Sequence, residues 1–330
     1  MNERKRVLVL FCGGTIVMEE KPDGSLAVPE DKDSAIEILR NCEPKLTTIA
    51  DYDIEFIANI DSTNITPADW DRIIMKIKEK YREYDGFVIT HGTDTMAYTA
   101  AALSVAINGL GKPVVLTGSQ IPGGRIESDA RRNLVNAFRL AIMDIAGVFI
   151  VFDERIILGS RATKASESRL DAFQSVNSED AGEISIDIKM KDWVKKRIRE
   201  THDIEVSPGF ESDIFVYTLS PGCDPNDLEF LLNNEEIKGI IIRAYGTGNI
   251  PYGFESFFKK ARARNLPVIV TSQCLHGKTL MHLYDVGRKA LELGAIEGHE
   301  QSLEILCAKL MWGLRHCPDR IEELINAENY

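Results

Sequence analysis

The chain lacks any apolar run approaching the ~20 residues that a membrane-spanning helix requires, and no secretory signal is recognisable in it. The first apolar stretch, Val7–Cys12, is too short for a signal segment and runs straight into glycine. The six cysteines form no C-x-x-C pair and no zinc-ligand spacing. We therefore expect reduced thiols, no metal site and a cytoplasmic protein.

The chain also has fewer basic residues than acidic ones. The 39 lysines and arginines are outnumbered by 51 aspartates and glutamates, which gives a formal net charge of −12 at pH 7. An acidic chain repels nucleic-acid phosphates and anionic membrane surfaces, so neither is expected as a partner. The 330 residues, 44% hydrophobic and 27% charged, fit a soluble globular protein long enough for two domains.

Short apolar runs alternate with amphipathic stretches through the first two-thirds of the sequence. Strands are predicted at Arg6–Phe11, Asp53–Asn59, Gly86–Thr90, Pro113–Thr117 and Val148–Phe152. Helices are predicted after Thr66-Pro67, where a capping residue precedes proline, and at Met96–Ile107 and Arg131–Ile145. This alternation predicts an α/β fold, with a mainly parallel sheet of the flavodoxin or Rossmann type flanked by helices.

A second, smaller α/β set follows a charged stretch with few large apolar residues, Asp187–Ser212. We expect an N-terminal domain at residues 1–190, a linker at 191–212 and a C-terminal α/β domain at 213–330. The strands predicted there are Asp213–Leu219, Lys238–Ala244 and Pro267–Thr271, and the helices are Pro225–Asn233, Gly253–Arg264, Val286–Leu293 and Ser302–Gly313.

Polar, glycine-rich clusters follow four of the predicted strands. Ligands bind beyond the carboxyl ends of strands in open parallel sheets, so four such clusters predict one composite site. Each cluster has an alternative explanation as a tight turn or a helix cap, which is the better one for Gly-Gly-Thr taken alone, and the first cluster lacks dinucleotide-binding spacing. The clusters are Gly13-Gly14-Thr15, Asp61-Ser62-Thr63, His91-Gly92-Thr93-Asp94-Thr95 and Gly118-Ser119-Gln120.

Two of these clusters carry a family resemblance. Cys12-Gly13-Gly14-Thr15-Ile16 and His91-Gly92-Thr93-Asp94-Thr95 resemble the two threonine loops of the bacterial-type asparaginase/glutaminase family. Segments that resemble its cytoplasmic type I branch include Thr117-Gly118-Ser119-Gln120-Ile121-Pro122, Arg161-Ala162-Thr163-Lys164 and Tyr245-Gly246-Thr247-Gly248-Asn249. The similarity extends over nearly the whole chain. It implies hydrolysis of L-asparagine to L-aspartate and ammonia, without a cofactor.

The resemblance implies a catalytic role for four residues. Thr15 would attack the amide carbon and form an acyl-enzyme, while Thr93, Asp94 and Lys164 would help to activate a nucleophile and later a water. A threonine hydroxyl is a weak nucleophile and needs such a network. Lysine is protonated at neutral pH and becomes a base only in a buried site. A neighbouring Asp94 favours the charged form, so the step that Lys164 serves stays open.

The resemblance also implies a substrate pocket shared between subunits. Ser62, preceded by Asp61, would bind the α-carboxylate, and Asp94 would meet the α-ammonium. Backbone N–H groups near Thr15 and Thr93 would form the oxyanion site. The other implied contacts are Gly14, Thr63, Gly92 and Ser119, with Asn249 supplied by a second copy of the chain. We therefore expect a homodimer or homotetramer.

The loop after the first threonine departs from the family. Family members usually carry a tyrosine there that closes the site, and this sequence has Ser25 in its place. Serine keeps a hydroxyl but has a shorter reach and no ring to exclude water. Either another residue replaces the tyrosine, or turnover is slower, or the substrate is not asparagine. In each case we expect the loop to be a lid.

A second asparagine site is a further hypothesis. Thr163, Arg243 and Cys274 resemble positions near a site through which some type I enzymes are activated by asparagine. Arg243 is equally explained by an ion pair with an acid at a subunit interface. Without the family resemblance, Lys164 would be an ordinary surface lysine and Asn249 a turn residue.

Other functions stay open at this point. A glutaminase differs by one methylene of substrate, typically worth only about 1–3 kcal/mol. The amidohydrolase component of a tRNA-dependent amidotransferase carries an extra N-terminal domain, whereas fourteen residues precede Thr15 here. A weakly catalytic amino-acid-binding protein is suggested by the missing tyrosine. A nucleotide-binding enzyme is disfavoured because no Walker lysine follows Gly13-Gly14.

Overall fold

The computed structural model describes residues 4–29, 31–198 and 203–327. Its contacts divide the chain into two compact units. Unit 1 comprises Met1–Ser175 and Glu179–Pro208, and unit 2 comprises Val176–Ser178 and Gly209–Tyr330. Both units are α/β structures with a parallel sheet, which confirms the predicted fold class.

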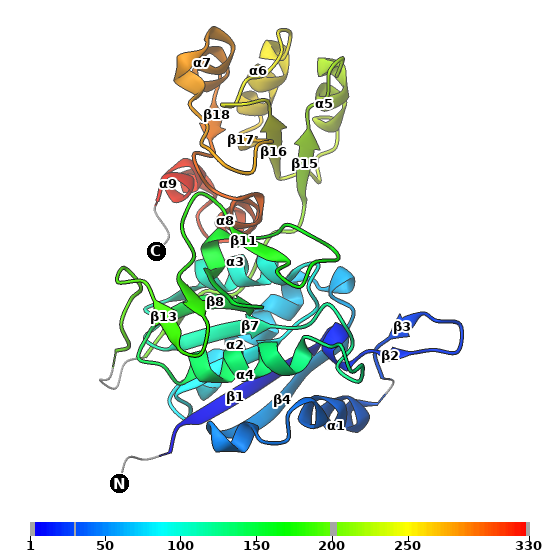
Figure 1. The fold of residues 1–330 in the computed structure, drawn as a ribbon. Helices are drawn as coiled ribbons and strands as arrows, with labels where there is room; N and C mark the ends of the chain where they lie inside the picture. Colours follow the sequence, from blue (N-terminus) through cyan, green and yellow to red (C-terminus); the bar gives the residue numbers. More distant parts are fainter. Residues whose placement is uncertain (1–3, 30, 199–202, 328–330) are drawn as a thin grey trace. The chain divides into compact units, whose positions relative to one another are not determined.

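Unit 1 is built on a sheet of eight strands in the order β13-β12-β9-β8-β7-β5-β1-β4 (Figure 1). Five neighbouring strands are parallel: β4 (Asp51–Ile60), β1 (Arg6–Gly13), β5 (Gly86–Thr90), β7 (Pro113–Thr117) and β8 (Gly147–Phe152). The sheet continues in antiparallel pairing through β9 (Arg155–Leu158), β12 (Gly182–Ile184) and β13 (Ile188–Met190). The sequence did not predict this antiparallel extension.

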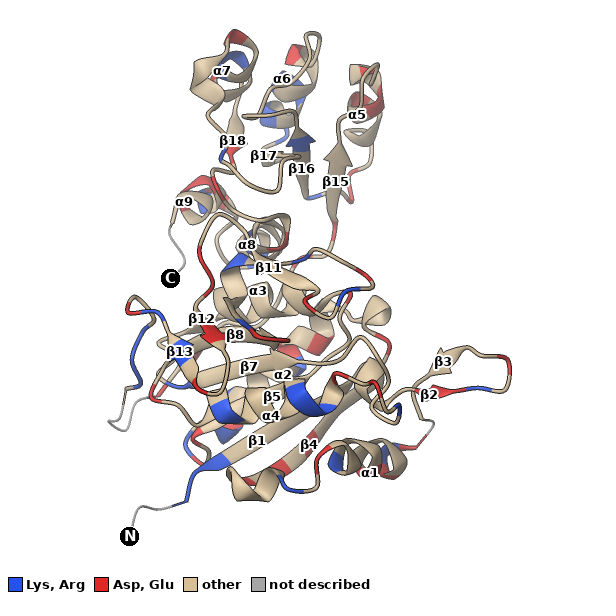
Figure 2. Cartoon of the chain, viewed as in Figure 1, with Lys and Arg blue, Asp and Glu red and all other residues tan. Residues whose placement is uncertain are grey.

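Both faces of the parallel strands β1, β5, β7 and β8 are buried, because helices cover each of them. The side chains of Val7, Val9 and Phe11 form one core cluster with α1 (Lys32–Cys42) and α4 (Ala130–Ala141). The alternate side chains of β1 are equally buried, and α2 (Pro67–Lys80) and α3 (Met96–Ala106) also contact the sheet. The central strands β5, β7 and β8 carry no charged residue within their bounds (Figure 2).

Helix α2 begins where the sequence predicts it. Thr66 is the N-cap, Pro67 takes the first helical position, and the Asp69 carboxylate accepts hydrogen bonds from the Thr66 N–H and hydroxyl, both at 2.7 Å. This reciprocal cap satisfies N–H groups that have no partner within the helix. It fixes the direction in which the chain leaves the loop after β4.

Shorter elements complete unit 1. Beyond β1 lie the 3-10 turn η1 (Thr15–Val17) and a hairpin of β2 (Glu19–Glu20) and β3 (Leu26–Ala27), and the turn η3 (Ser62–Asn64) follows β4. Two further antiparallel pairs are β10 (Ala162–Lys164) with β11 (Phe173–Ser175), and β6 (Ile107–Asn108) with β14 (Glu205–Val206). The charged stretch 187–212 therefore contains β13 and β14, which pair with strands of unit 1.

Unit 2 has a four-stranded parallel sheet. Its strands, in spatial order, are β15 (Ile214–Thr218), β16 (Gly239–Ala244), β17 (Val268–Ser272) and β18 (Ala295–Glu297). Its helices are α5 (Pro225–Leu231), α6 (Glu255–Ala263), α7 (Asp285–Glu292), α8 (Leu303–His316) and α9 (Ile321–Asn326). Apolar side chains of β16 and β17 pack with Phe254, Phe257 and Phe258 in a core of its own. No helix in the described parts of either unit is long and apolar enough to cross a membrane.

Candidate active site

Three loops of unit 1 meet at Gly92. A Cβ atom added to Gly14 would lie 2.5 Å from the Gly92 nitrogen, and one added to Gly92 would lie 2.5 Å from Ser62 Oγ. Gly14 also has a positive φ of 95°, which glycine adopts without strain. The loops after β1, β4 and β5 are therefore in direct contact at the carboxyl edge of the sheet, because only glycine allows so close an approach.

Thr15 stands at the start of η1 with its side chain half-buried. The turn is closed by hydrogen bonds from Val17 N–H to the Gly14 carbonyl (3.1 Å) and from Met18 N–H to the Thr15 carbonyl (3.0 Å). Within the described residues the Thr15 hydroxyl makes no hydrogen bond. This hydroxyl is thus oriented by the backbone of a short turn and remains available to a ligand.

The second threonine lies in a network of side chains. Lys164 Nζ donates to Thr93 Oγ1 at 2.8 Å and to Asp94 Oδ1 at 2.5 Å. Thr93 Oγ1 donates to Gln120 Oε1 at 3.0 Å. An ammonium has only donors, so the Thr93 oxygen must accept from Lys164 and direct its own proton to Gln120. The structure thereby brings together Thr93, Asp94 and Lys164 from two separate segments, and adds a partner, Gln120, whose role the sequence did not suggest.

Gln120 is held in one orientation. Its Nε2 donates to the carbonyls of Glu167 (3.0 Å) and Arg169 (3.2 Å), which leaves Oε1 facing Thr93. Its backbone N–H donates to both carboxylate oxygens of Asp129 at 3.1 Å. Only the adjacency of Gln120 to Ser119 in a strand-end cluster marked it in the sequence. Its partners are 9 to 49 residues away along the chain, and no local pattern shows them.

The first turn of α4 supports this fourth loop. The Asp129 carboxylate also accepts from Ile121 N–H (3.1 Å) and from Asn133 Nδ2 (2.9 Å), and Asn133 Nδ2 donates to the Gly118 carbonyl at 3.0 Å. Ser119 is fully buried, and its hydroxyl donates to the Ile121 carbonyl at 2.7 Å. The loop after β7 is therefore rigidly positioned beside Thr93.

The cluster after β4 is arranged around Ser62. Asp61 caps η3 by accepting the Thr63 N–H at 3.0 Å, and both residues are exposed. Ser62 is 4% exposed and lies against Gly92. Its carbonyl accepts the Thr95 hydroxyl at 2.8 Å. This bond ties the Ser62 turn to the start of α3.

Two titratable groups beside these loops are uncharged. Burial lowers the pKa of His91 to about 4, so its imidazole is neutral at physiological pH. Burial raises the pKa of the Cys12 thiol, so it is not a thiolate nucleophile. The described residues contain no group of three or more His, Cys, Asp or Glu side chains able to hold a metal ion.

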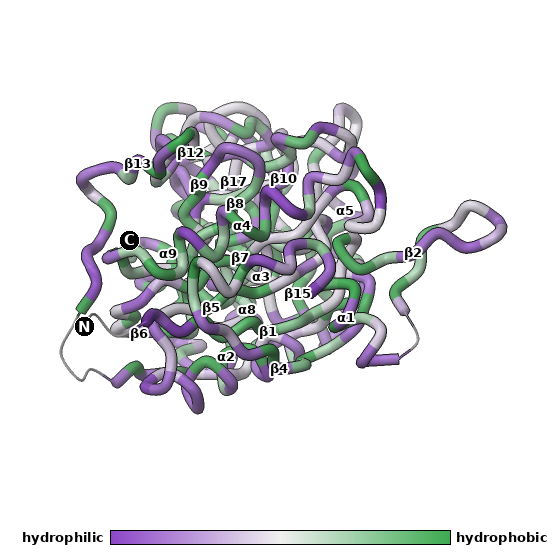
Figure 3. Tube along the Cα trace, turned by 60° about the horizontal axis from the view of Figure 1, so that its bottom comes forward, coloured by the Kyte–Doolittle hydropathy of each residue, from purple (hydrophilic) through white to green (hydrophobic). Residues whose placement is uncertain are grey.

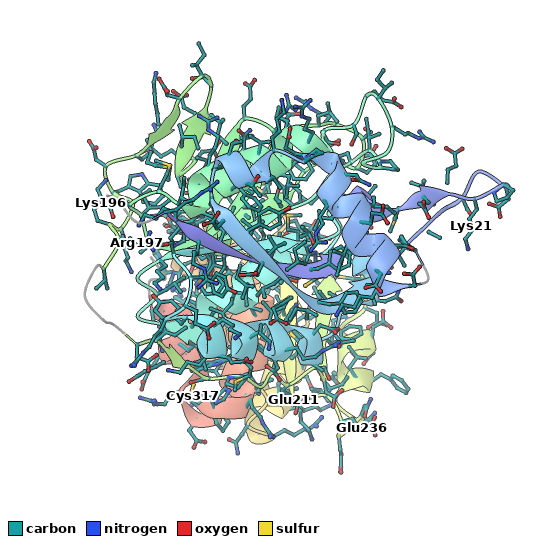
Figure 4. All side chains as sticks on the ribbon, turned by 90° about the horizontal axis from the view of Figure 1, so that it is seen from below. Lys21, Lys196, Arg197, Glu211, Glu236 and Cys317 are labelled. Atoms are coloured by element: carbon teal, nitrogen blue, oxygen red, sulfur yellow. The ribbon has the colours of Figure 1, made fainter. Side chains whose placement is uncertain are left out.

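Ser25 lies on the β2–β3 hairpin, which extends outward from unit 1 (Figure 1). The hairpin is largely hydrophilic (Figure 3), and Lys21 on it lies apart from the strands of the sheet (Figure 4). Ser25 is exposed, and its hydroxyl donates to Asp23 Oδ1 at 2.6 Å. This serine therefore serves the hairpin turn in the conformation seen here.

The other predicted site residues divide between the units. Thr163 is buried on β10 of unit 1, next to Lys164. In unit 2, Arg243 on β16 and the exposed Cys274 after β17 lie at the carboxyl ends of neighbouring strands. Asn249 closes a turn in which its N–H donates to the Tyr245 carbonyl at 2.8 Å. Within the described residues, Arg243 Nε and Asn249 Oδ1 are buried without hydrogen-bond partners.

An open parallel sheet with several loops meeting at its carboxyl edge defines a small-ligand site. The family model described as Asparaginase, N-terminal, matches residues 6–196, and the Glutaminase/Asparaginase C-terminal domain matches residues 213–324. The chain therefore belongs to the asparaginase family of hydrolases, as its two threonine loops predict.

Similar proteins include three that align over almost the whole chain. The L-asparaginase of Thermococcus kodakarensis is 37% identical over 97% of this chain and 95% of its own length. L-asparaginase 1 of Escherichia coli is 36% identical over 93% of this chain and 91% of its own length. A component of the glutamyl-tRNA(Gln) amidotransferase of Methanosarcina mazei is also 36% identical, over 94% of this chain and 74% of its own length.

Solved structures agree with this assignment. The structure of the Thermococcus kodakarensis L-asparaginase superposes with a TM-score of 0.84 over 98% of this chain and 97% of that chain, at 35% identity. L-asparaginase I of Vibrio cholerae superposes with a TM-score of 0.87 over 98% of both chains, at 32% identity. These neighbours confirm the resemblance to the type I branch.

Proposed function

We propose that this protein hydrolyses L-asparagine to L-aspartate and ammonia, with Thr15 as the nucleophile. The observation that carries the proposal is the contact between the Gly14-Thr15 turn and the Gly92-Thr93 loop. This contact joins the turn that carries Thr15 to the loop that carries Thr93, whose hydroxyl accepts a hydrogen bond from Lys164. Weak hydroxyl nucleophiles require such a network of neighbouring groups.

The proposed reaction proceeds in two halves. Thr15 Oγ1 attacks the side-chain amide carbon, the C–N bond breaks, and the hydroxyl proton ends on the leaving nitrogen, which departs as ammonia. Water then attacks the Thr15 ester, the C–O bond breaks, and Thr15 recovers its proton as aspartate leaves. Lys164 and Asp94 polarise Thr93 and supply charge beside the reacting carbonyl.

Substrate recognition follows from the same loops. Ser62 and Asp61 bind the α-carboxylate end through the turn at η3, and Asp94 faces the α-ammonium. Gly14, Thr63, Gly92 and Ser119 line the remainder, and we assign Asn249 to the pocket of a second copy. This requires a homodimer or homotetramer. The unpaired cysteines support a reducing compartment, and we propose the cytoplasm.

Ammonia release from a panel of amides by the purified chain tests the proposal. We expect L-asparagine to be the best substrate and both Thr15→Ala and Thr93→Ala to lose at least about a thousandfold in kcat. Thr47→Ala, at an exposed threonine of the same unit, is the matched control and should keep full activity. Appreciable turnover by Thr15→Ala would show that the nucleophile is misassigned.

Two alternatives are tested by the same preparation. The 36% identity to a component of a glutamyl-tRNA(Gln) amidotransferase favours a second candidate, an amidohydrolase that acts with a partner chain and charged tRNA. A net charge of −12 argues against binding tRNA. Ammonia release only in the presence of partner and tRNA would establish that function. Calorimetric binding of asparagine without ammonia release would establish an amino-acid-binding protein instead.

We also propose an activating asparagine site in unit 2 at Arg243 and Cys274, and only the family resemblance assigns Thr163 to it. The buried Arg243 Nε lacks a hydrogen-bond acceptor within the described residues and could bind a carboxylate. The expected outcome is a sigmoidal dependence of rate on asparagine that Arg243→Ala abolishes without changing the oligomer. A hyperbolic curve in the unmodified protein would remove the proposal.

A further inference from the structure

His91 is a fully buried side chain that none of the proposed catalytic steps uses. It follows β5 directly and precedes Gly92, and its ring contacts Thr99 on α3. Nε2 lies 2.8 Å from Thr99 Oγ1 on α3, and Nδ1 lies 2.7 Å from the Gly92 carbonyl oxygen. Trp70 Nε1 on α2 donates to the same Thr99 oxygen at 3.0 Å.

Donor and acceptor can be assigned to these three hydrogen bonds in only one consistent way when the imidazole is neutral. The Trp70 indole can only donate, and the Gly92 carbonyl can only accept. Nδ1 must therefore carry the proton that His91 donates to Gly92. With the imidazole neutral, Nε2 has a free lone pair and accepts from the Thr99 hydroxyl. The hydrogen bonds therefore run in one direction, from Trp70 through Thr99 and His91 to Gly92, and each donor in this series has an acceptor.

The last bond of this chain fixes a peptide plane at the centre of the candidate site. The described residues contain no cis peptide bond, so the Gly92 carbonyl and the Thr93 N–H point in opposite directions. Holding the carbonyl toward His91 turns the Thr93 N–H away from His91. Within the described residues the Thr93 N–H makes no hydrogen bond. It is therefore free to bind a ligand oxygen.

We propose that Trp70, Thr99 and His91 form a buried positioning relay that orients the Gly92–Thr93 peptide for amide hydrolysis. The inference rests on the proposed function of the site. The relay touches no substrate and acts only through the Gly92 carbonyl. Hydrogen bonds in a chain of low local dielectric polarise one another, and the bond to Gly92 also makes the Thr93 N–H a stronger donor.

A matched pair of substitutions at Thr99 tests the relay. Thr99→Val keeps the shape of the side chain but removes the hydroxyl that bonds His91 Nε2 and Trp70 Nε1, and we expect kcat to fall about tenfold. In the proposed reaction the Thr93 N–H binds the oxyanion, the negatively charged oxygen of the attacked carbonyl. This oxyanion forms only after the substrate has bound, so KM should change less than about twofold. Thr99→Ser restores the hydroxyl and should recover kcat to within about twofold. A kcat for Thr99→Val equal to that of the unmodified chain would overturn the proposal.

The tautomer supplies a readout that does not depend on catalytic activity. We expect ¹⁵N spectra of histidine-labelled protein without substrate to show His91 protonated on Nδ1, assigned by the signal missing in His91→Gln. A proton on Nε2 would overturn the relay. If the unmodified chain hydrolyses no amide, the proposed function fails. The tautomer then tests the relay by itself, and a proton on His91 Nε2 still overturns it.

Discussion

The proton of the Thr93 hydroxyl is directed by its neighbours rather than by threonine itself. Lys164 donates to Thr93 Oγ1, so the hydroxyl proton goes to Gln120 Oε1. The Gln120 amide cannot rotate without losing its bonds to the Glu167 and Arg169 carbonyls. Gln120, which has no ionisable group, thus determines the orientation of the Thr93 hydroxyl, which is proposed to take part in catalysis.

Gln120→Leu should therefore slow turnover. It removes the acceptor of the Thr93 proton and two donors to the loop at 167–169, each a bond worth about 0.5–1.5 kcal/mol. We expect kcat for asparagine to fall by roughly threefold to tenfold. Gln174→Leu, at another half-buried glutamine in unit 1, is the control and should leave kcat unchanged. A Gln120→Leu enzyme with unaltered kcat would show that the Thr93 proton needs no fixed acceptor.

The sequence marked the loops of the candidate site but not the hydrogen bonds within it. The glycine-rich clusters marked one edge of the sheet, because ligands bind beyond the carboxyl ends of parallel strands, and the family resemblance assigned Thr15, Thr93 and Ser62 to the site. The supporting roles of Gln120 and Asp129 depend on partners from other elements. Hydrogen bonds between segments 27 to 49 residues apart leave no periodic signal in the chain.

At the scale of elements, the β2–β3 hairpin is held at both ends. The Ile16 carbonyl accepts Gly123 N–H at 3.2 Å before it, and Asn59 Nδ2 donates to the Pro29 carbonyl at 2.6 Å after it. Between these points, Glu20 forms an exposed ion pair with Arg125 in the loop after β7. The hairpin is thus linked to a neighbouring loop by one charged contact near its base.

Arg125→Ala should loosen this hairpin without unfolding the protein. An exposed ion pair contributes at most about 1 kcal/mol, so the free energy of unfolding should change little. We expect amide hydrogen exchange in residues 19–27 to quicken about twofold to fivefold, measured by mass spectrometry. Arg288→Ala, which removes an exposed arginine that pairs with Asp285 in unit 2, should leave that exchange unchanged. Unaltered exchange in Arg125→Ala would mean that the two ends alone hold the hairpin.

Elements with strong patterns were predicted, and weakly patterned ones were not. The buried parallel strands are continuous apolar runs, and α2 carries a proline and a reciprocal cap at its start. In contrast, β2 and β3 have two residues each, and β12 and β13 have three. Strands this short depend on pairing with distant segments, so the sequence alone does not reveal them.

At the scale of the whole molecule, the fold places the candidate site by topology. Strands β4, β1, β5 and β7 are neighbours and parallel, so the loops after them meet at one edge. This is why four polar clusters at strand ends in the sequence predict one site. The same topology buries His91 at the end of β5 against α3, which links the chemistry of the loop to the stability of unit 1.

The stability of unit 1 should fall as the pH is lowered from about 6.5 to about 4. The pKa of His91 is about 4 in the folded chain because burial disfavours its charged form, and about 6.5 in the unfolded chain. Between these values the unfolded chain binds a proton that the folded chain does not, so the free energy of unfolding decreases with falling pH. The difference corresponds to about 3 kcal/mol, and the contribution is constant above pH 6.5. Urea unfolding monitored by hydrogen exchange of β5 measures it.

His91→Gln removes the titrating group and should flatten the pH dependence in this window, whatever the variant does to stability at pH 7. His282→Gln, at an exposed histidine of unit 2, should retain it. The lowered pKa of the Asp69 and Asp85 carboxyls, which accept hydrogen bonds from Thr66 and Arg6, adds a loss of stability at more acid pH. The unmodified chain, His91→Gln and His282→Gln all share this loss of stability at more acid pH. Equal slopes between pH 6.5 and 4.5 in the unmodified chain and in His91→Gln would show that His91 is protonated without unfolding, and hence that the ring is not held neutral by the fold.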